Sequence, residues 1–217
     1  KIRDVMTLAH EVGHGVHQYL ANDKGLLVSE TPLTLAETAS VFGEMLTFKH
    51  MLKNSKNKSD RIFLLRSKIE DMLNTVVRQI AFFNFERRVH QSRTSGEVSA
   101  DDISNFWMET QKESFGSTVK LSDDYKFFWA YIPHFIHSPF YVYAYAFGDC
   151  LVNTLYSSYE TGLDDFNSKY LNLLKSGGSK HYREILKDFD LDPSKKDFWQ
   201  SGMKIIKNFI DELEDLS

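Results

Sequence analysis

The chain has 217 residues and a net charge of −4 at pH 7, with 42% hydrophobic and 26% charged residues. Its 17 Phe, 10 Tyr and 3 Trp can fill a sizeable core, so the composition excludes a disordered or fibrous chain. The slightly acidic balance lacks the basic field that attracts nucleic acids and anionic membranes, so we expect no nucleic-acid partner.

Apolar residues recur mostly every three or four positions, and the chain has only 4 Pro and 11 Gly. This pattern predicts an all-α fold with little or no sheet. The first helix is expected over about residues 4–20, followed by a loop over about 26–33. The second helix is expected over about 34–52, with Thr34 as its N-cap and Glu37 completing a capping box three residues later.

The rest of the chain carries further helical patterns. A long helix is expected over about 60–92, and Ser99 with Asp102 begins another that ends near Phe115. An aromatic-rich connection over about 123–132 precedes helices expected over about 138–159, 163–176, 182–188 and 195–216. No repeat or linker divides these patterns, so we expect one helical region over 1–217. Because a helical pattern begins almost at Lys1, we expect this region to be part of a longer protein.

Cys150 is the single cysteine, so no disulfide within the chain and no CxxC site can form. The longest apolar stretches fall short of the roughly 18 residues that a membrane-spanning helix needs. No positively charged and then apolar signal region precedes the first helix. We therefore expect a cytoplasmic protein with no membrane partner.

Residues 10–14 read His-Glu-Val-Gly-His, the HExxH pattern, inside the first expected helix. The histidines His10 and His14, four residues apart, project from nearly one helix face and can hold one metal ion. Glu11 lies about 100° around the helix from His10, where it can take a proton from water that the ion activates. Zinc suits such a site best, and the alternative is a surface helix that carries histidines without a metal.

A hydrolytic zinc site usually has three protein ligands, so one more is needed. His17 faces the same way as His14 but lies about 10 Å along the helix axis from His10, too far to share an ion. Glu37 is the preferred ligand, because an antiparallel second helix would return it to the first. Glu30, in the intervening loop, stays open as an alternative.

Two further carboxylates are candidates for supporting the site. Glu44 lies seven residues after Glu37 on nearly the same helix face, where it could accept a hydrogen bond from the outward nitrogen of a ligating histidine. Asp4 is a weaker candidate for the same role.

Three blocks of residues follow one another along the chain. The first block is the HExxH segment extended to His17, and the second is Leu-Ala-Glu-Thr-Ala-Ser at 35–40. The third is Ile-Pro-His-Phe at 132–135, followed by a tyrosine-rich stretch at 139–148. In this order the three blocks resemble the oligoendopeptidase F family of thimet oligopeptidase-like zinc metallopeptidases. The resemblance implies a helical catalytic lobe, the C-terminal part of a longer enzyme whose upstream half closes the other wall of a substrate channel.

The same resemblance implies one zinc ion per chain, bound by His10, His14 and Glu37, with Glu11 as the general base. It also implies an endopeptidase that cleaves internal bonds of short, unstructured peptides, because a deep channel excludes folded proteins.

The third block carries implied roles in substrate binding. His134 is expected to bind substrate or to stabilise the oxyanion of the tetrahedral intermediate. Tyr141 is the preferred oxyanion donor, with Tyr143 and Tyr145 as alternative substrate-binding residues. In a helix Tyr141 and Tyr145 share a face while Tyr143 points about 200° away, so all three cannot line one cleft.

Two other functions stay open. An exopeptidase of the same class would need a cation to bind the C-terminal carboxylate of its substrate, and residues 133–155 contain no Lys or Arg. A non-catalytic helical module, which binds a metal only for stability or binds partner proteins, would not respond chemically to the change Glu11→Gln.

Overall fold

The computed structural model describes residues 1–216, and every regular element among them is a helix. The all-α prediction is therefore confirmed. None of these helices combines the length and the apolar character that crossing a membrane requires. The helices form two compact units: unit 1 comprises Lys1–Met72 and the chain from Phe147 onward, and unit 2 comprises Leu73–Ala146. A single helical region over 1–217 stays a prediction.

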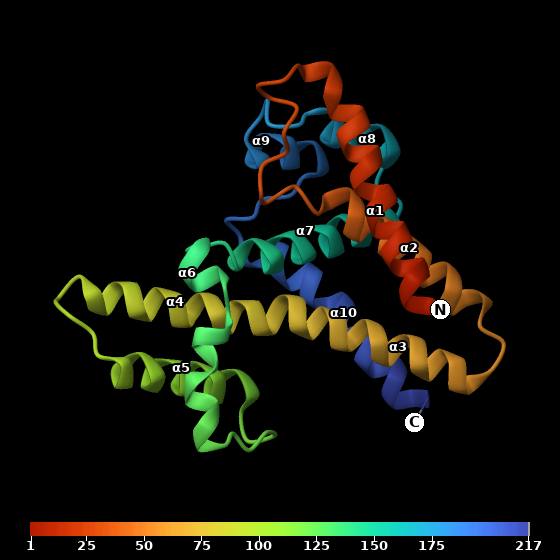
Figure 1. The fold of residues 1–217 in the computed structure, drawn as a ribbon. Coiled ribbons are helices and arrows are strands. Elements are labelled where there is room, and N and C mark those ends of the chain that lie inside the picture. The colour runs from red at the N-terminus through yellow and green to blue at the C-terminus, as the bar shows by residue number, and fades with distance from the viewer. Residues whose placement is uncertain (217) are drawn as a thin grey trace. The chain divides into compact units, whose positions relative to one another are not determined.

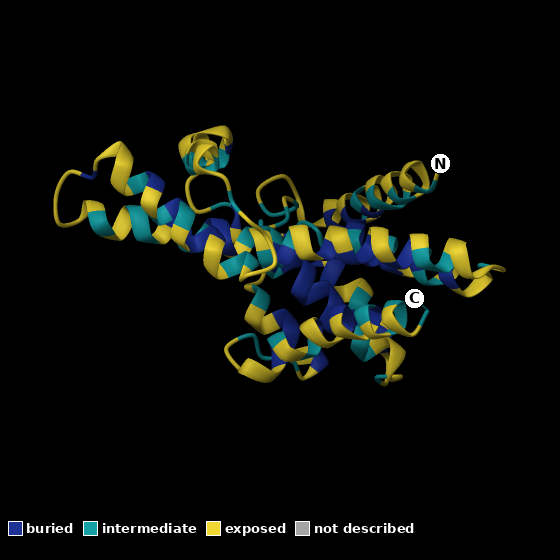
Figure 2. Cartoon of the chain, turned by 90° about the horizontal axis from the view of Figure 1, so that it is seen from below, coloured by how far each residue is buried: buried dark blue, intermediate teal, exposed yellow. Residues whose placement is uncertain are grey.

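Helices α1 (Ile2–Ala21) and α2 (Thr38–Asn54) lie side by side in unit 1 (Figure 1). Their backbones meet closely at Gly13, where an added Cβ atom would lie 2.5 Å from the Cα atom of Ser40. A single 3₁₀ turn, η1 (Asn22–Lys24), follows α1. Few residues of α1 are buried, so the helix that starts at the mark N in Figure 2 is mostly yellow and teal.

The start of α2 differs from the prediction. Residues 32–37 form successive turns, in which Leu35 and Thr38 donate backbone hydrogen bonds to carbonyls three residues back, at 2.8 and 3.0 Å. The first bond that spans four residues runs from Val41 to Glu37, so α2 begins at Thr38 with Glu37 in the N-cap position. The predicted N-cap at Thr34 and its capping box with Glu37 are wrong, because these turns keep both residues outside the helix.

Unit 1 also contains α8 (Phe166–Lys175), α9 (Tyr182–Leu186) with the 3₁₀ turn η4 (Lys187–Phe189), and α10 (Lys196–Leu216), together with α3 (Lys58–Leu73) up to Met72 and α7 (Tyr143–Glu160) from Phe147. An aromatic cluster ties α2 to α7 and α8. The ring of Phe42 has centroid distances of 4.5–6.0 Å to the rings of Tyr156, Tyr159, Phe166 and Tyr170. Ring pairs of this kind contribute about 0.5–1.5 kcal/mol each beyond the burial of their area, which fixes α2 in the unit.

Unit 2 is built on α4 (Gln79–Arg93) and α5 (Ala100–Phe115), which pack against each other. Ser99 caps α5 through a capping box with Asp102, which confirms that predicted start. The 3₁₀ helix η3 (Asp123–Tyr131) and the short helix α6 (His134–His137) follow. The buried core of the unit consists of Phe82, Phe85, Trp107, Ile132 and Val142.

Two predicted helices have different boundaries in the structure. The helix predicted over 60–92 is present as α3 and α4, with the π-helical turn η2 (Asn74–Arg78) between them. The helix predicted from residue 138 begins only at Tyr143, because Phe140 has a φ of 60° and interrupts the helical backbone. Tyr141 therefore lies in the turn ahead of α7 and not on the helix face predicted for it.

Candidate metal centre

His10 and His14 lie one turn apart on α1, and both are partly exposed. Their Nε2 atoms are 3.0 Å apart, and the two rings meet edge to face with centroids 4.7 Å apart. The helix pitch thus brings one nitrogen of each ring to the same point, as the four-residue spacing predicts.

Glu37, at the N-cap position of α2, supplies a third donor atom. Its Oε2 lies 3.5 Å from Nε2 of His10 and 3.4 Å from Nε2 of His14. The hydroxyl of Ser40 donates a hydrogen bond to the same Oε2 at 2.7 Å and so orients the carboxylate. Ser40 is not among the residues predicted from the sequence, although its spacing of three from Glu37 at a helix start is a usual signal for such a bond.

The three donor atoms form a triangle with edges of 3.0, 3.4 and 3.5 Å. Ligand atoms at about 2.0–2.1 Å from a tetrahedral zinc ion lie about 3.3 Å from one another, so an ion of this size fits the triangle. Two histidines and one carboxylate also form a donor set that catalytic zinc sites use, with one position left for water. Among residues 1–216 no second group of three His, Cys, Asp or Glu side chains converges in this way.

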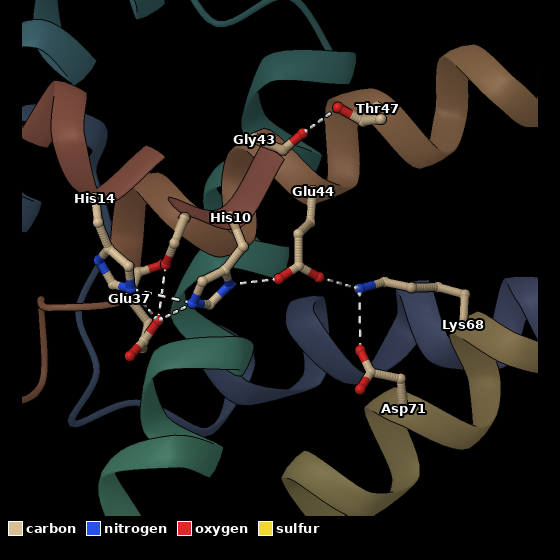
Figure 3. A network of polar contacts seen from close by, with 9 residues as sticks. His10, His14, Glu37, Gly43, Glu44, Thr47, Lys68 and Asp71 are labelled. Carbon is tan, nitrogen blue, oxygen red and sulfur yellow. Dashed lines mark hydrogen bonds and ion pairs between the residues drawn. The ribbon is translucent and has the colours of Figure 1, made fainter. Parts of the chain in front are cut away.

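Glu44 of α2 contacts His10 on the other side of its ring. Oε1 of Glu44 lies 2.5 Å from Nδ1 of His10 (Figure 3). A carboxylate at this distance accepts the proton on Nδ1, which leaves the lone pair of Nε2 for a metal. The contact predicted from the spacing of Glu44 is therefore present.

Three other acidic residues considered from the sequence lie outside the triangle. Glu11 is exposed on α1, directly after His10. Glu30 is exposed in the loop before α2. Asp4 is exposed near the start of α1. The geometry thus favours Glu37 over Glu30 as the third donor.

The side chain of His17, on α1, is buried and supplies no atom to the triangle. Desolvation, and to a lesser degree the charge of His14, lowers the pKa of His17 to about 4. Its Nε2 lies 3.4 Å from the hydroxyl of Thr31. His17 is thus a packed, neutral side chain at pH 7.

In unit 2, His134 lies beside two of the three tyrosines of the third sequence block. The hydroxyl of Tyr145 is 3.2 Å from Nε2 of His134, and the ring of Tyr141 is 5.7 Å from the ring of His134. The rings of Tyr141 and Tyr145 are 5.3 Å apart. The ring of Tyr143 packs instead against Phe83, at 5.8 Å, which agrees with the expectation that all three tyrosines cannot share one face.

A buried carboxylate supports the turn ahead of Tyr141. Glu86 of α4 is only 2% exposed, and its Oε1 accepts a hydrogen bond from the backbone N–H of Phe140 at 2.6 Å. Burial raises the pKa of Glu86, against the opposing effects of this hydrogen bond and of His90 and His134. Glu86 was not predicted, because one Glu within an aromatic-rich helix gives no sequence signal for a contact with a distant turn.

A helix with the HExxH pattern, whose two histidines converge with a carboxylate at the start of the next helix, defines the metal-site class of the helical metallopeptidases. The sequence profile of Peptidase family M3 matches residues 1–205, so the chain belongs to this family. The resemblance inferred from the three sequence blocks is thereby confirmed.

The relatives are bacterial oligopeptidases. Oligoendopeptidase F (plasmid) of Lactococcus lactis subsp. cremoris is 30% identical over 215 residues, which cover 98% of this chain and 36% of that protein. Oligopeptidase PepF of Bacillus subtilis (strain 168) is 28% identical over 217 residues, with 99% and 32% covered. The crystal structure of oligoendopeptidase-F from Enterococcus faecium matches with a TM-score of 0.86 at 26% identity, over 99% of this chain and 39% of that chain. The chain thus spans about a third of the length of these relatives.

Proposed function

We propose that this chain is the metal-binding part of a zinc-dependent metalloendopeptidase that hydrolyses internal bonds of short, unstructured peptides. The observation that carries the proposal is the triangle of donor atoms from His10, His14 and Glu37, whose edges are those of a tetrahedral zinc site. The names of the relatives support peptides as the substrate class.

In this proposal His10, His14 and Glu37 hold one zinc ion per chain. The bound ion would supply Lewis acidity, which polarises the scissile carbonyl and lowers the pKa of water. Glu11 acts as the general base: it removes a proton from the attacking water and passes it to the departing amine. The exposed position of Glu11 next to His10 leaves its carboxylate accessible for both transfers.

Substrate contacts in unit 2 are assigned to His134 and Tyr141, which would donate hydrogen bonds to the oxyanion. The hydrogen-bond distance between Tyr145 and Nε2 of His134 supports Tyr145 as the residue that orients this ring. Tyr143, which packs on Phe83, is the least suited of the three tyrosines to contact substrate. Loss of one oxyanion donor typically lowers the rate about 10²–10³-fold.

The proposal includes a cytoplasmic location. Its support is Cys150, which is the single cysteine and is buried in α7. Burial raises the pKa of its thiol to about 12, so the residue is unreactive and packs as a small apolar side chain. Fractionation of the source cells tests this part of the proposal, and recovery of the protein outside the cytoplasm would contradict it.

Zinc content and peptide hydrolysis, measured on the same preparation, test the proposed chemistry. We expect one zinc ion per wild-type chain and cleavage of an internally quenched peptide. Glu11→Gln should keep the zinc and lose cleavage, because it removes the base but no ligand. Glu37→Ala should lose the zinc. Glu30→Gln is the matched control, since it neutralises a carboxylate of the loop before α2 that lies outside the triangle, and it should keep both properties.

Two outcomes would contradict the proposal. Equal peptide cleavage by wild type and Glu11→Gln would remove Glu11 from the mechanism. Zinc binding without any cleavage would instead mean that the metal site is assembled but that the upstream half of the longer enzyme is required for cleavage. Loss of zinc in Glu30→Gln but not in Glu37→Ala would move the third ligand to the loop.

A further inference from the structure

Behind Glu44, unit 1 buries a lysine among three carboxylates. Lys68 of α3 has only 4% of its side chain exposed. Its Nζ lies 3.7 Å from Oε2 of Glu44 and 3.6 Å from Oδ2 of Asp71 (Figure 3). Asp149 of α7 is also buried: desolvation raises its pKa to about 6, and the charge of Lys68 opposes this rise. A buried ammonium costs several kcal/mol unless carboxylates compensate it, so Lys68 is held by these partners.

Glu44 joins this lysine to the metal centre. Its two oxygens face opposite partners: Oε1 lies 2.5 Å from Nδ1 of His10, and Oε2 faces Lys68. Figure 3 shows Glu44 between the two side chains, which come from α1 and α3. A carboxylate held on both sides cannot rotate without losing one partner. The line from Lys68 through Glu44 to His10 therefore fixes the direction of the His10 ring.

We propose that Lys68 is a positioning residue of the metal centre: its ammonium holds Glu44 in the orientation that directs Nε2 of His10 toward His14 and Glu37. This inference rests on the proposed function, because it assumes that the triangle of donor atoms binds zinc. Lys68 contacts neither the ion nor the substrate, and it acts through Glu44.

Two other roles for Lys68 lead to different results. If Lys68 only stabilises the fold, its removal lowers the free energy of unfolding and leaves the zinc dissociation constant of the folded protein unchanged. If Lys68 acts only by its charge, its removal tightens zinc binding, because two nearby cations repel each other. A positioning role predicts the opposite sign, since loss of a group that orients a metal ligand typically lowers metal affinity about 10–100-fold.

The test measures the zinc dissociation constant by competition with a chelator and the free energy of unfolding by urea titration. Lys68→Met, which keeps most of the length of the side chain and removes its charge, should weaken zinc binding about tenfold or more. In a Glu44→Gln background the same change should add little, because the carboxylate that Lys68 holds is already absent. Lys49→Met is the matched control: it removes a lysine from α2 that pairs with Glu160 at 3.0 Å, and it should leave zinc binding unchanged.

A second variant separates a loss of zinc affinity from a loss of folding. Lys68→Met leaves Glu44 and Asp149 without their cation, which destabilises unit 1. Lys68→Met combined with Asp149→Asn removes one of these buried charges and should show the same loss of zinc affinity. Zinc binding as tight as in wild type in the folded variants, or losses that add in the Glu44→Gln background, would overturn the positioning role. Failure of the wild-type protein to bind zinc would instead overturn the proposed function, and this measurement needs no variant.

Discussion

Gly13 lies where α1 meets the start of α2, and a methyl group added there tests how closely the elements of the metal centre are packed. A Cβ atom at Gly13 would lie 2.5 Å from the Cα atom of Ser40 and 2.6 Å from the carbonyl oxygen of Ala39. Carbon atoms in contact are ordinarily about 3.5–4.0 Å apart, so the two helices must separate by about 1 Å to admit it. Both obstructing atoms belong to the backbone, which cannot turn aside as a side chain can.

The free-energy change in Gly13→Ala has two opposing parts. Alanine gains about 0.8–1.0 kcal/mol of helix propensity over glycine, whereas overpacking typically costs about 1–3 kcal/mol and occasionally more. With the backbone as the obstacle, we expect a net loss of about 2 kcal/mol, which lowers Tm by roughly 4–8 °C for a chain of this size. Separation of the helices would also carry Glu37 away from His10 and His14, now at 3.5 and 3.4 Å, so zinc binding should weaken about tenfold or more.

Gly15→Ala is the matched control for this prediction. It is the same substitution two residues along α1, where nothing lies within 4 Å of the added Cβ atom. Gly15→Ala should gain about 0.5–1 kcal/mol of stability and raise Tm by about 1–4 °C, with zinc binding unchanged. Thermal unfolding of the metal-free proteins, followed by circular dichroism, measures both effects. Gly13→Ala as stable as Gly15→Ala would refute the close contact between α1 and α2.

Three further substitutions test other parts of the chain. Because burial raises the pKa of Asp149 from the usual 3.8 to about 6, its contribution to stability is fully present below about pH 3.8 and is lost as the pH rises to about 6. Asp149→Asn should therefore exceed wild type in urea titrations at pH 8 by up to roughly 3 kcal/mol, and an equal gain at pH 4 would contradict this cause. Glu86→Ala leaves the N–H of Phe140 unpaired and should cost about 2–3 kcal/mol, so an unchanged Tm would count against the role of this carboxylate. Ser99→Ala removes the hydroxyl that accepts a hydrogen bond from the N–H of Asp102 at 3.1 Å, so it should lower the free energy of unfolding by about 1 kcal/mol. Hydrogen exchange at the start of α5 should become faster. Unchanged exchange would show that the cap does not stabilise the helix.

The three donor atoms of the metal centre were predictable because they depend on local periodicity. His10 and His14 share a face whenever residues 10–14 are helical, and α1 is helical throughout this segment. Glu37 was preferred because a second helix would return along the first. The convergence of Glu37 with the two histidines needs only that α2 follows α1. The helical position that Thr34 was expected to give Glu37 is wrong, because turns replace that part of the helix.

Apart from Glu44, the residues that surround the candidate site were not predictable, because tertiary packing brings them together. Lys68 comes from α3 and Asp149 from α7, and a lone Lys or Asp in an amphipathic helix ordinarily faces solvent. The late start of α7 depends on the positive φ of Phe140. Glycine and asparagine are the residues that usually signal a positive φ, and position 140 carries neither, so the sequence does not predict this turn. Glu86, which holds this residue, is 54 positions away along the chain.

X-ray absorption at the zinc edge, on protein loaded with one equivalent of zinc, tests whether His10, His14 and Glu37 hold the metal. We expect a shell of nitrogen and oxygen ligands at about 2.0–2.1 Å with the scattering signature of two imidazoles, no sulfur ligand, and loss of bound zinc in Glu37→Ala. A shell with one imidazole or none, or a shell that Glu37→Ala leaves unchanged, would contradict the assignment of His10, His14 and Glu37 as the metal centre.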